Sequence, residues 1–178
     1  MITINKVKDE FGWLSCMSPY PVEYERTRYR TCEALFQCLR FPNNPEVQNE
    51  ILEQKSPIAA KMKARKYKSL LNRGAKWDES NDDIPLMYNC LKLKLFQHPD
   101  LQTKLIQTGE DLIVEDCTSH DRESARFWGM VKKEDNWIGS NVLGLLWMQI
   151  RDELKTAENI EEYLKDEKFS CSKILIEK

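Results

Sequence analysis

The sequence has few of the residues on which metal sites and histidine-dependent catalysis rely. Its 178 residues include two histidines, His98 and His120, and six cysteines that form no Cys-x-x-Cys pair. Structural zinc sites use clustered cysteine and histidine ligands, and Ser-His-Asp or Cys-His sites need a suitably placed histidine. The sequence therefore predicts no metal site and disfavours a histidine-activated nucleophile.

Long apolar runs are also missing. No run approaches the roughly 20 residues that a membrane-spanning helix needs, and residues 1–12 lack the apolar stretch of a signal peptide. The composition, 41% hydrophobic and 31% charged, is typical of a soluble globular protein. We therefore expect a cytoplasmic protein without a membrane partner, whose cysteines are reduced and mostly buried.

Neither sign of charge dominates, since 27 Lys and Arg residues against 29 Asp and Glu residues give a net charge of -2. This balance argues against non-specific nucleic-acid binding by the whole surface. The exception is residues 55–76, which contain eight Lys or Arg residues and no acidic residue. Within it Lys61, Arg65 and Lys68 have helical spacing and form a basic stripe, either a solvated helix face or a phosphate-binding surface.

The pattern of apolar residues, caps and stops predicts a mainly helical α+β protein with one domain. Helices are expected at residues 31–41, 45–54, 57–72, 84–97 and 101–108, and short strands at residues 2–4, 22–24 and 112–114. Residues 115–126 are expected to form a long polar loop. We place the domain at residues 1–155 and treat residues 156–178 as a C-terminal appendage.

A helix that begins after Asn141 and continues to Arg151 is apolar on more than one face, which predicts a core helix. Asn141 is a favourable N-cap residue. Gly139 and Gly144 allow a backbone or a ligand to approach closely. We expect this helix start to be a favourable place for an anionic group.

Glu33 lies in the first turn of the helix that Thr31 is expected to cap. The positive end of the helix dipole stabilises an anion there, so the carboxylate should stay ionised near neutral pH. It therefore suits a base or a stabiliser of positive charge better than an acid. A solvated surface carboxylate is the alternative interpretation of the same position.

Seven short motifs follow one another along residues 10–155. They are Leu14-Ser15-Cys16-Met17 with Tyr20-Pro21; Tyr29, Thr31, Glu33, Phe36-Gln37 and Arg40-Phe41; Pro57, Ala60-Lys61 and Arg65; Trp77 with Met87, Lys94 and Gln97; Thr108-Gly109; Trp128-Gly129; and Gly139, Asn141, Leu143 and Gly144 with Met148 and Arg151. Each motif alone is weak, but the ordered set resembles the NADAR, or YbiA-like, N-glycosidase superfamily. The resemblance implies a single-domain, multihelical YbiA-like fold with a few short strands.

The resemblance also implies a reaction, the hydrolysis of an N-glycosidic bond between ribose and a base-like amine, without a cofactor or a metal. The implied substrate is a phosphorylated ribosyl or ADP-ribosyl small molecule, with ADP-ribosylated nucleic acid left open. The candidate catalytic residues are Glu33, Trp128 and Asp121. The candidate substrate-binding residues are Trp77, Asn141, Gly139, Gly129, Arg40, Lys61 and Arg65.

Three positions depart from the family pattern. Cys16 replaces an asparagine, Ala34 replaces a histidine beside Glu33, and Ala125 replaces an aspartate that usually precedes the Trp-Gly motif by three residues. Asp121, in the longer loop here, is the candidate substitute for that aspartate. These departures keep an alternative function open, a catalytically weak or inactive module that binds ADP-ribose or a nucleotide. The oligomeric state also stays open.

Overall fold

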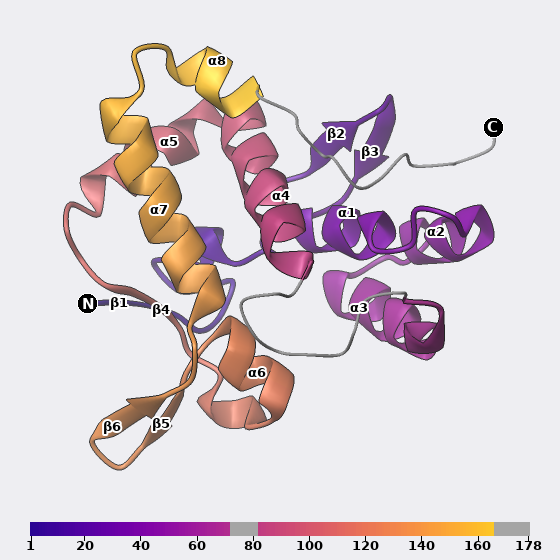
Figure 1. The fold of residues 1–178 in the computed structure, drawn as a ribbon, viewed down its shortest axis with the longest axis horizontal. Coiled ribbons are helices and arrows are strands. Elements are labelled where there is room, and N and C mark those ends of the chain that lie inside the picture. Colours follow the sequence, from indigo (N-terminus) through magenta and orange to yellow (C-terminus); the bar gives the residue numbers. More distant parts are fainter. Residues whose placement is uncertain (72–81, 166–178) are drawn as a thin grey trace.

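The protein is a mainly helical α+β domain, as predicted, and the computed structural model describes residues 1–71 and 82–165 (Figure 1). The helices are α1 (Cys32–Leu39), α2 (Pro45–Leu52), α3 (Pro57–Lys66), α4 (Asp83–Gln97), α5 (Pro99–Gln107), α6 (Glu123–Trp128), α7 (Val142–Thr156) and α8 (Ile160–Lys165). Among the described residues, none of these helices combines the length and the apolarity required to cross a membrane.

The strands of the described residues form three separate pairs. Strand β1 (Ile2–Ile4) pairs in parallel with β4 (Ile113–Glu115). The hairpins are β2 (Val22–Tyr24) with β3 (Thr27–Tyr29), and β5 (Val131–Lys133) with β6 (Asn136–Ile138).

Three of these strands, β3, β5 and β6, were not predicted. Glu25 and Arg26 connect β2 to β3 with φ of 47° and 63°, and Glu134 has φ of 53° between β5 and β6. Hairpin turns of this kind usually carry Asn or Gly, which tolerate positive φ. Because non-glycine residues take these positions here, the sequence lacks the usual hairpin signal.

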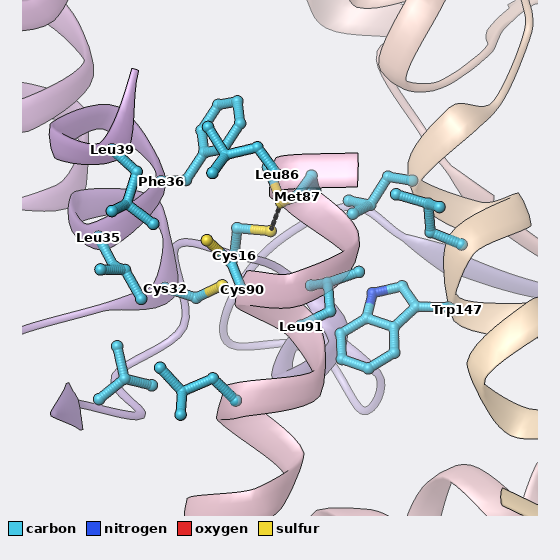
Figure 2. Close-up of a cluster of buried hydrophobic side chains, with 14 of the residues drawn as sticks. Cys16, Cys32, Leu35, Phe36, Leu39, Leu86, Met87, Cys90, Leu91 and Trp147 are labelled. Carbon is cyan, nitrogen blue, oxygen red and sulfur yellow. Dashed lines mark hydrogen bonds between the residues drawn. The ribbon is translucent and has the colours of Figure 1, made fainter. Parts of the chain in front are cut away.

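The core lies on both sides of α4, which separates α1 from α7 (Figure 2). Leu35 from α1, Leu91 from α4 and Trp147 from α7 are fully buried within it. The Cys16 thiol donates a hydrogen bond to the Met87 sulfur at 3.4 Å. The five cysteines in the described residues are free, and all but Cys117 are buried, whereas Cys171 lies outside the described part of the chain.

Local capping signals placed several helices correctly. The Thr31 hydroxyl accepts a hydrogen bond from the Ala34 backbone N–H at the start of α1, and Ser56 does the same at the start of α3. Both side chains satisfy backbone donors that have no partner within the helix. Helix α4 begins at Asp83, one residue before the predicted start, and Asp82 holds the N-cap position without a side-chain cap bond.

Two other boundaries differ from the prediction. The helix expected to reach residue 72 ends at Lys66, and Lys68 belongs to a following 3-10 turn, so the basic stripe does not continue along one helix face. The polar loop expected at residues 115–126 instead contains the end of β4, a 3-10 turn at Thr118–His120 and the first turn of α6.

The described part of the expected appendage folds back onto the domain. Helix α8 packs against α4, and Leu164 is 2% exposed within the hydrophobic core (Figure 1). The Tyr163 hydroxyl donates to the Glu153 carboxylate of α7, which also accepts from Tyr88 of α4. Residues 156–165 therefore contribute to the same core as the preceding helices.

Candidate functional site

The Glu33 carboxylate is buried and held in place, although it lies in a first helical turn. The residue is 5% exposed. Its Oε1 accepts a hydrogen bond from Gln37 Nε2 at 2.9 Å and lies 3.9 Å from the Lys61 ammonium of α3. The alternative of a solvated surface carboxylate is therefore wrong.

A chain of polar contacts behind Glu33 fixes its orientation. Arg40 donates to Gln37 Oε1 at 3.2 Å and forms an ion pair with Asp83 of α4 at 2.9 Å. The amide of Gln37 is thereby oriented with its nitrogen toward Glu33. Arg40 was a candidate substrate-binding residue, and in the structure its guanidinium takes part in this internal network.

The segment at residues 13–18 supports the start of α1. The Glu33 backbone N–H donates to the Cys16 carbonyl at 2.9 Å. Lys94, fully buried in α4, donates to two carbonyls and one hydroxyl of this segment, and Trp147 Nε1 of α7 donates to a third carbonyl. Burial lowers the pKa of Lys94, so its ammonium depends on these acceptors. Helices α4 and α7 thus hold the segment that accepts the backbone hydrogen bond of Glu33.

A second carboxylate, Glu115 at the end of β4, belongs to the same site and was missed in the sequence. It is half-buried, and it interacts electrostatically with both Lys61 and Glu33. Removal from water raises its pKa to about 7, with Lys61 acting to lower that pKa and Glu33 acting to raise it. The sequence signal was an acidic residue directly after two buried strand residues.

Asn141, at the start of α7, binds β4 through its side-chain amide. Asn141 Oδ1 accepts from the Glu115 backbone N–H at 3.1 Å, and Asn141 Nδ2 donates to the Ile113 carbonyl at 2.8 Å. The expected side-chain cap is absent, because the side chain of Asn141 bonds β4 instead and its backbone has φ of 53°. Asn141 was also predicted to bind phosphate, and both polar atoms of its side chain are engaged within the protein.

Two glycines bring β4 close to its neighbours. A side chain at Gly144 would place its Cβ 2.1 Å from the Ile113 carbonyl oxygen, and one at Gly129 would place its Cβ 2.3 Å from the Glu115 carbonyl oxygen. Both distances are far shorter than atoms can approach. At Gly144 the close neighbour is backbone, the first of the two alternatives predicted for Gly139 and Gly144, and the same holds at Gly139, where a Cβ would lie 2.4 Å from the Gly129 carbonyl oxygen.

Trp128 contacts α1 close to Glu33. Its half-buried indole meets the Phe36 ring edge to face, with ring centroids 5.8 Å apart and an interplanar angle of 83°. Phe36 lies one turn after Glu33 on α1. The structure therefore brings Glu33, Lys61, Glu115 and Trp128 to one region.

The remaining predicted residues are Arg65, Trp77, Asp121 and Gly139. Arg65 is exposed on α3, and Trp77 falls outside the described residues. Asp121 forms ion pairs with Arg126 at 2.6 Å and Lys133 at 3.3 Å, which lower its pKa to about 2. Asp121 and Gly139 line an open depression of about 430 Å³, whose lining residues are Asp121, Arg122, Glu123, Arg126, Phe127, Gly139 and Ser140.

Within residues 1–71 and 82–165, no group of three or more His, Cys, Asp or Glu residues could hold a metal ion. The chemistry that the described site offers comes from two carboxylates, an ammonium group and an aromatic ring. The carboxylates differ in their surroundings, since Glu33 receives a donated hydrogen bond from Gln37 whereas desolvation acts most strongly on Glu115.

Fold and site together define a class, a multihelical α+β protein with a buried, oriented carboxylate beside a lysine and a tryptophan. The chain belongs to the NADAR family, whose domain matches residues 4–155. The NMR structure of the Escherichia coli protein YbiA is similar, with a TM-score of 0.65 and 25% identity, covering 92% of this chain and 88% of that one.

Relatives by sequence carry related names. N-glycosidase YbiA of Shigella boydii is 26% identical over 154 residues, which are 86% of this chain and 88% of that protein. N-glycosidase R617 of Acanthamoeba polyphaga mimivirus is 35% identical over 85 residues, 43% of this chain and 46% of that protein. Protein irg-1 of Caenorhabditis elegans is 27% identical over 133 residues, 68% of this chain and 59% of that protein.

Proposed function

We propose that this protein is an N-glycoside hydrolase that cleaves the bond between ribose and a base-like amine in a phosphorylated ribosyl or ADP-ribosyl compound. The observation that carries the proposal is the buried Glu33 carboxylate, oriented by Gln37 and placed 3.9 Å from Lys61. The names of the YbiA and mimivirus relatives support the reaction class. The proposed substrate is a small molecule, with ADP-ribosylated nucleic acid as the larger alternative.

The chemistry follows from the charge that develops on the sugar. As the bond between C1′ and the nitrogen lengthens, the ribose becomes oxocarbenium-like and positive at C1′. A carboxylate fixed close to this carbon stabilises the positive charge, and its effect is larger away from bulk water. Glu33 then accepts a proton from the water that adds to C1′.

The remaining residues serve to hold the substrate. We assign Trp128 the role of stacking against a flat leaving base. The Lys61 side chain, 42% exposed, and the exposed Arg65 supply positive charge for a phosphate. The depression that contains Gly139 and Asp121 is the proposed location for the more distant part of an ADP-ribosyl substrate.

The test is the variant Glu33→Gln, which keeps the shape of the side chain and removes its charge. A ribosylamino-pyrimidine phosphate, NAD and ADP-ribosylated DNA would be incubated with each protein, and released sugar would be measured. We expect turnover to fall by about 10²-fold or more, while ADP-ribose binding measured by calorimetry stays nearly unchanged. Glu46→Gln, an exposed carboxylate in the first turn of α2, is the matched control.

Normal turnover by the Glu33→Gln protein would contradict the proposal. Binding of ADP-ribose by the unaltered protein, without any product after prolonged incubation, would instead favour the non-catalytic binding module. Both Ala34 and Ala125, the departures that suggested this alternative, are buried against the core.

A further inference from the structure

We infer that Glu115 is the general acid of this site, the group that gives a proton to the nitrogen of the departing base. The inference rests on the proposed function and extends it, since it divides the reaction between two carboxylates. Glu33 acts on the sugar and the water, and Glu115 acts on the leaving group.

The position of Glu115 is fixed by its backbone. Its N–H donates to Asn141 of α7, and its carbonyl accepts from the Met130 N–H at 2.8 Å. Its Cβ lies 3.0 Å from the point where a Cβ on Gly129 would be. Glu115 is therefore packed directly beside the Trp128-Gly129 segment, whose indole is the proposed platform for the base.

The titratable groups around Glu115 come from α1, from α3 and from the residues that follow β4. Glu33 of α1 and Lys61 of α3 face it, and Asp116 and Cys117 follow it in the chain. Desolvation and the negative charge of Glu33 favour the protonated acid, and Lys61 opposes them. With a pKa of about 7, Glu115 holds its proton in much of the population near neutral pH and can release it to a base.

Two carboxylates whose surroundings differ in this way suit the two halves of a glycoside hydrolysis. The bond between C1′ and nitrogen breaks with its electron pair moving to nitrogen, which takes the proton of Glu115. Water forms the new bond to C1′ and gives its proton to Glu33. Exchange with solvent then returns a proton to Glu115 and removes one from Glu33, so the net reaction consumes one water.

The leaving group provides a direct test. An exocyclic amine needs a proton to depart, whereas the pyridinium base of nicotinamide mononucleotide departs as a neutral molecule without one. We would measure kcat and KM for Glu115→Gln with a ribosylamino-pyrimidine phosphate and with nicotinamide mononucleotide. We expect kcat to fall by about 10²-fold to 10³-fold with the amine and by less than about 5-fold with the mononucleotide.

The pH dependence gives a second readout. As pH rises through about 7, Glu115 loses its proton, so kcat of the unaltered protein with the amine should fall on the basic side. In Glu115→Gln this basic limb should disappear. Glu23→Gln, an exposed carboxylate on β2, should leave both the rates and the pH profile unchanged.

The outcomes separate the two proposals. Equal losses on both substrates, or an unchanged rate and basic limb with the amine, would overturn the role of Glu115. Loss of activity in Glu33→Gln together with normal amine cleavage by Glu115→Gln would leave the proposed function intact and remove only this inference. If the unaltered protein cleaves neither substrate, and ADP-ribosylated DNA also yields no sugar, the proposed function fails and this inference fails with it.

Discussion

Glu33 and Glu115 show how one site can give two carboxylates different chemistry. Glu33 accepts a hydrogen bond from Gln37, and the Lys61 ammonium lies 3.9 Å away. The Glu115 side chain is removed from water, and the described contacts include no hydrogen-bond donor to its carboxylate. Desolvation therefore raises the pKa of Glu115 to about 7. The proposed roles of base and acid are assigned from these surroundings rather than from residue type.

Trp128 offers a prediction at the same scale. If its indole stacks on the base, Trp128→Ala should weaken substrate binding by about 5-fold to 150-fold, since stacking of a base on an aromatic side chain contributes roughly 1–3 kcal/mol. Trp128→Phe should retain most of the affinity. Steady-state KM and calorimetry would measure both. Trp137→Ala, which removes another half-buried tryptophan on β6, should have little effect on affinity, and an equal effect would argue against stacking.

At the scale of elements, the site depends on the contact between β4 and the start of α7. Asn141 joins them with two hydrogen bonds, and Gly144 allows the close approach. Among the described strands β4 pairs with β1, and no strand pairing joins it to α7, so the Asn141 side chain supplies the hydrogen bonds between the two elements. The Asn141 contacts therefore connect core packing to the placement of Glu115.

Replacing Asn141 with Ala tests this connection. The change leaves the Ile113 carbonyl and the Glu115 N–H without their partner and puts Ala at positive φ, so we expect the free energy of unfolding to fall by about 2–4 kcal/mol. Cleavage should slow at temperatures where the protein remains folded, because Glu115 shifts. Asn159→Ala, which removes an exposed cap from α8, should cost only about 1 kcal/mol. Denaturant unfolding and kcat would measure both effects, and equal stability losses would contradict the assignment.

At the scale of the whole molecule, distant segments meet around one core. Lys94 and Trp147 hold the segment at residues 13–18, which in turn accepts the backbone N–H of Glu33. Helix α8 packs against α4 near the C-terminal end of α7, whereas β4 lies near the N-terminal end of α7 (Figure 1). Stability and catalysis can therefore be separated experimentally, because α8 contributes to the core without contributing a proposed site residue.

Truncating Leu164 on α8 provides that separation. Leu164→Ala removes a buried side chain, so the free energy of unfolding should fall by about 2–5 kcal/mol. Cleavage at 25 °C by the folded protein should remain unchanged. Leu145→Ala, at a leucine that is 53% exposed on α7, should alter stability by less than about 0.5 kcal/mol. Thermal unfolding and kcat/KM would test the pair, and a large loss of activity in folded Leu164→Ala would show that α8 influences the site.

The sequence by itself determined where several helices begin and which family the chain belongs to. Caps such as Thr31 and Ser56 act on backbone groups a few residues away, so their helices could be predicted without knowledge of distant contacts. The ordered motifs likewise indicated the NADAR family and singled out Glu33, and the match over residues 4–155 confirms the family.

Only the tertiary structure decided what surrounds each of these side chains. The burial of Glu33, the arrival of Glu115 beside it, and the bonds of Asn141 to β4 all depend on segments far apart in the chain. A carboxylate's proton affinity is set by the water and the charges near it, and chain neighbours do not specify either. For this reason the sequence could name the first carboxylate of the proposed site, while the second became visible only after folding brought α1, α3 and β4 together.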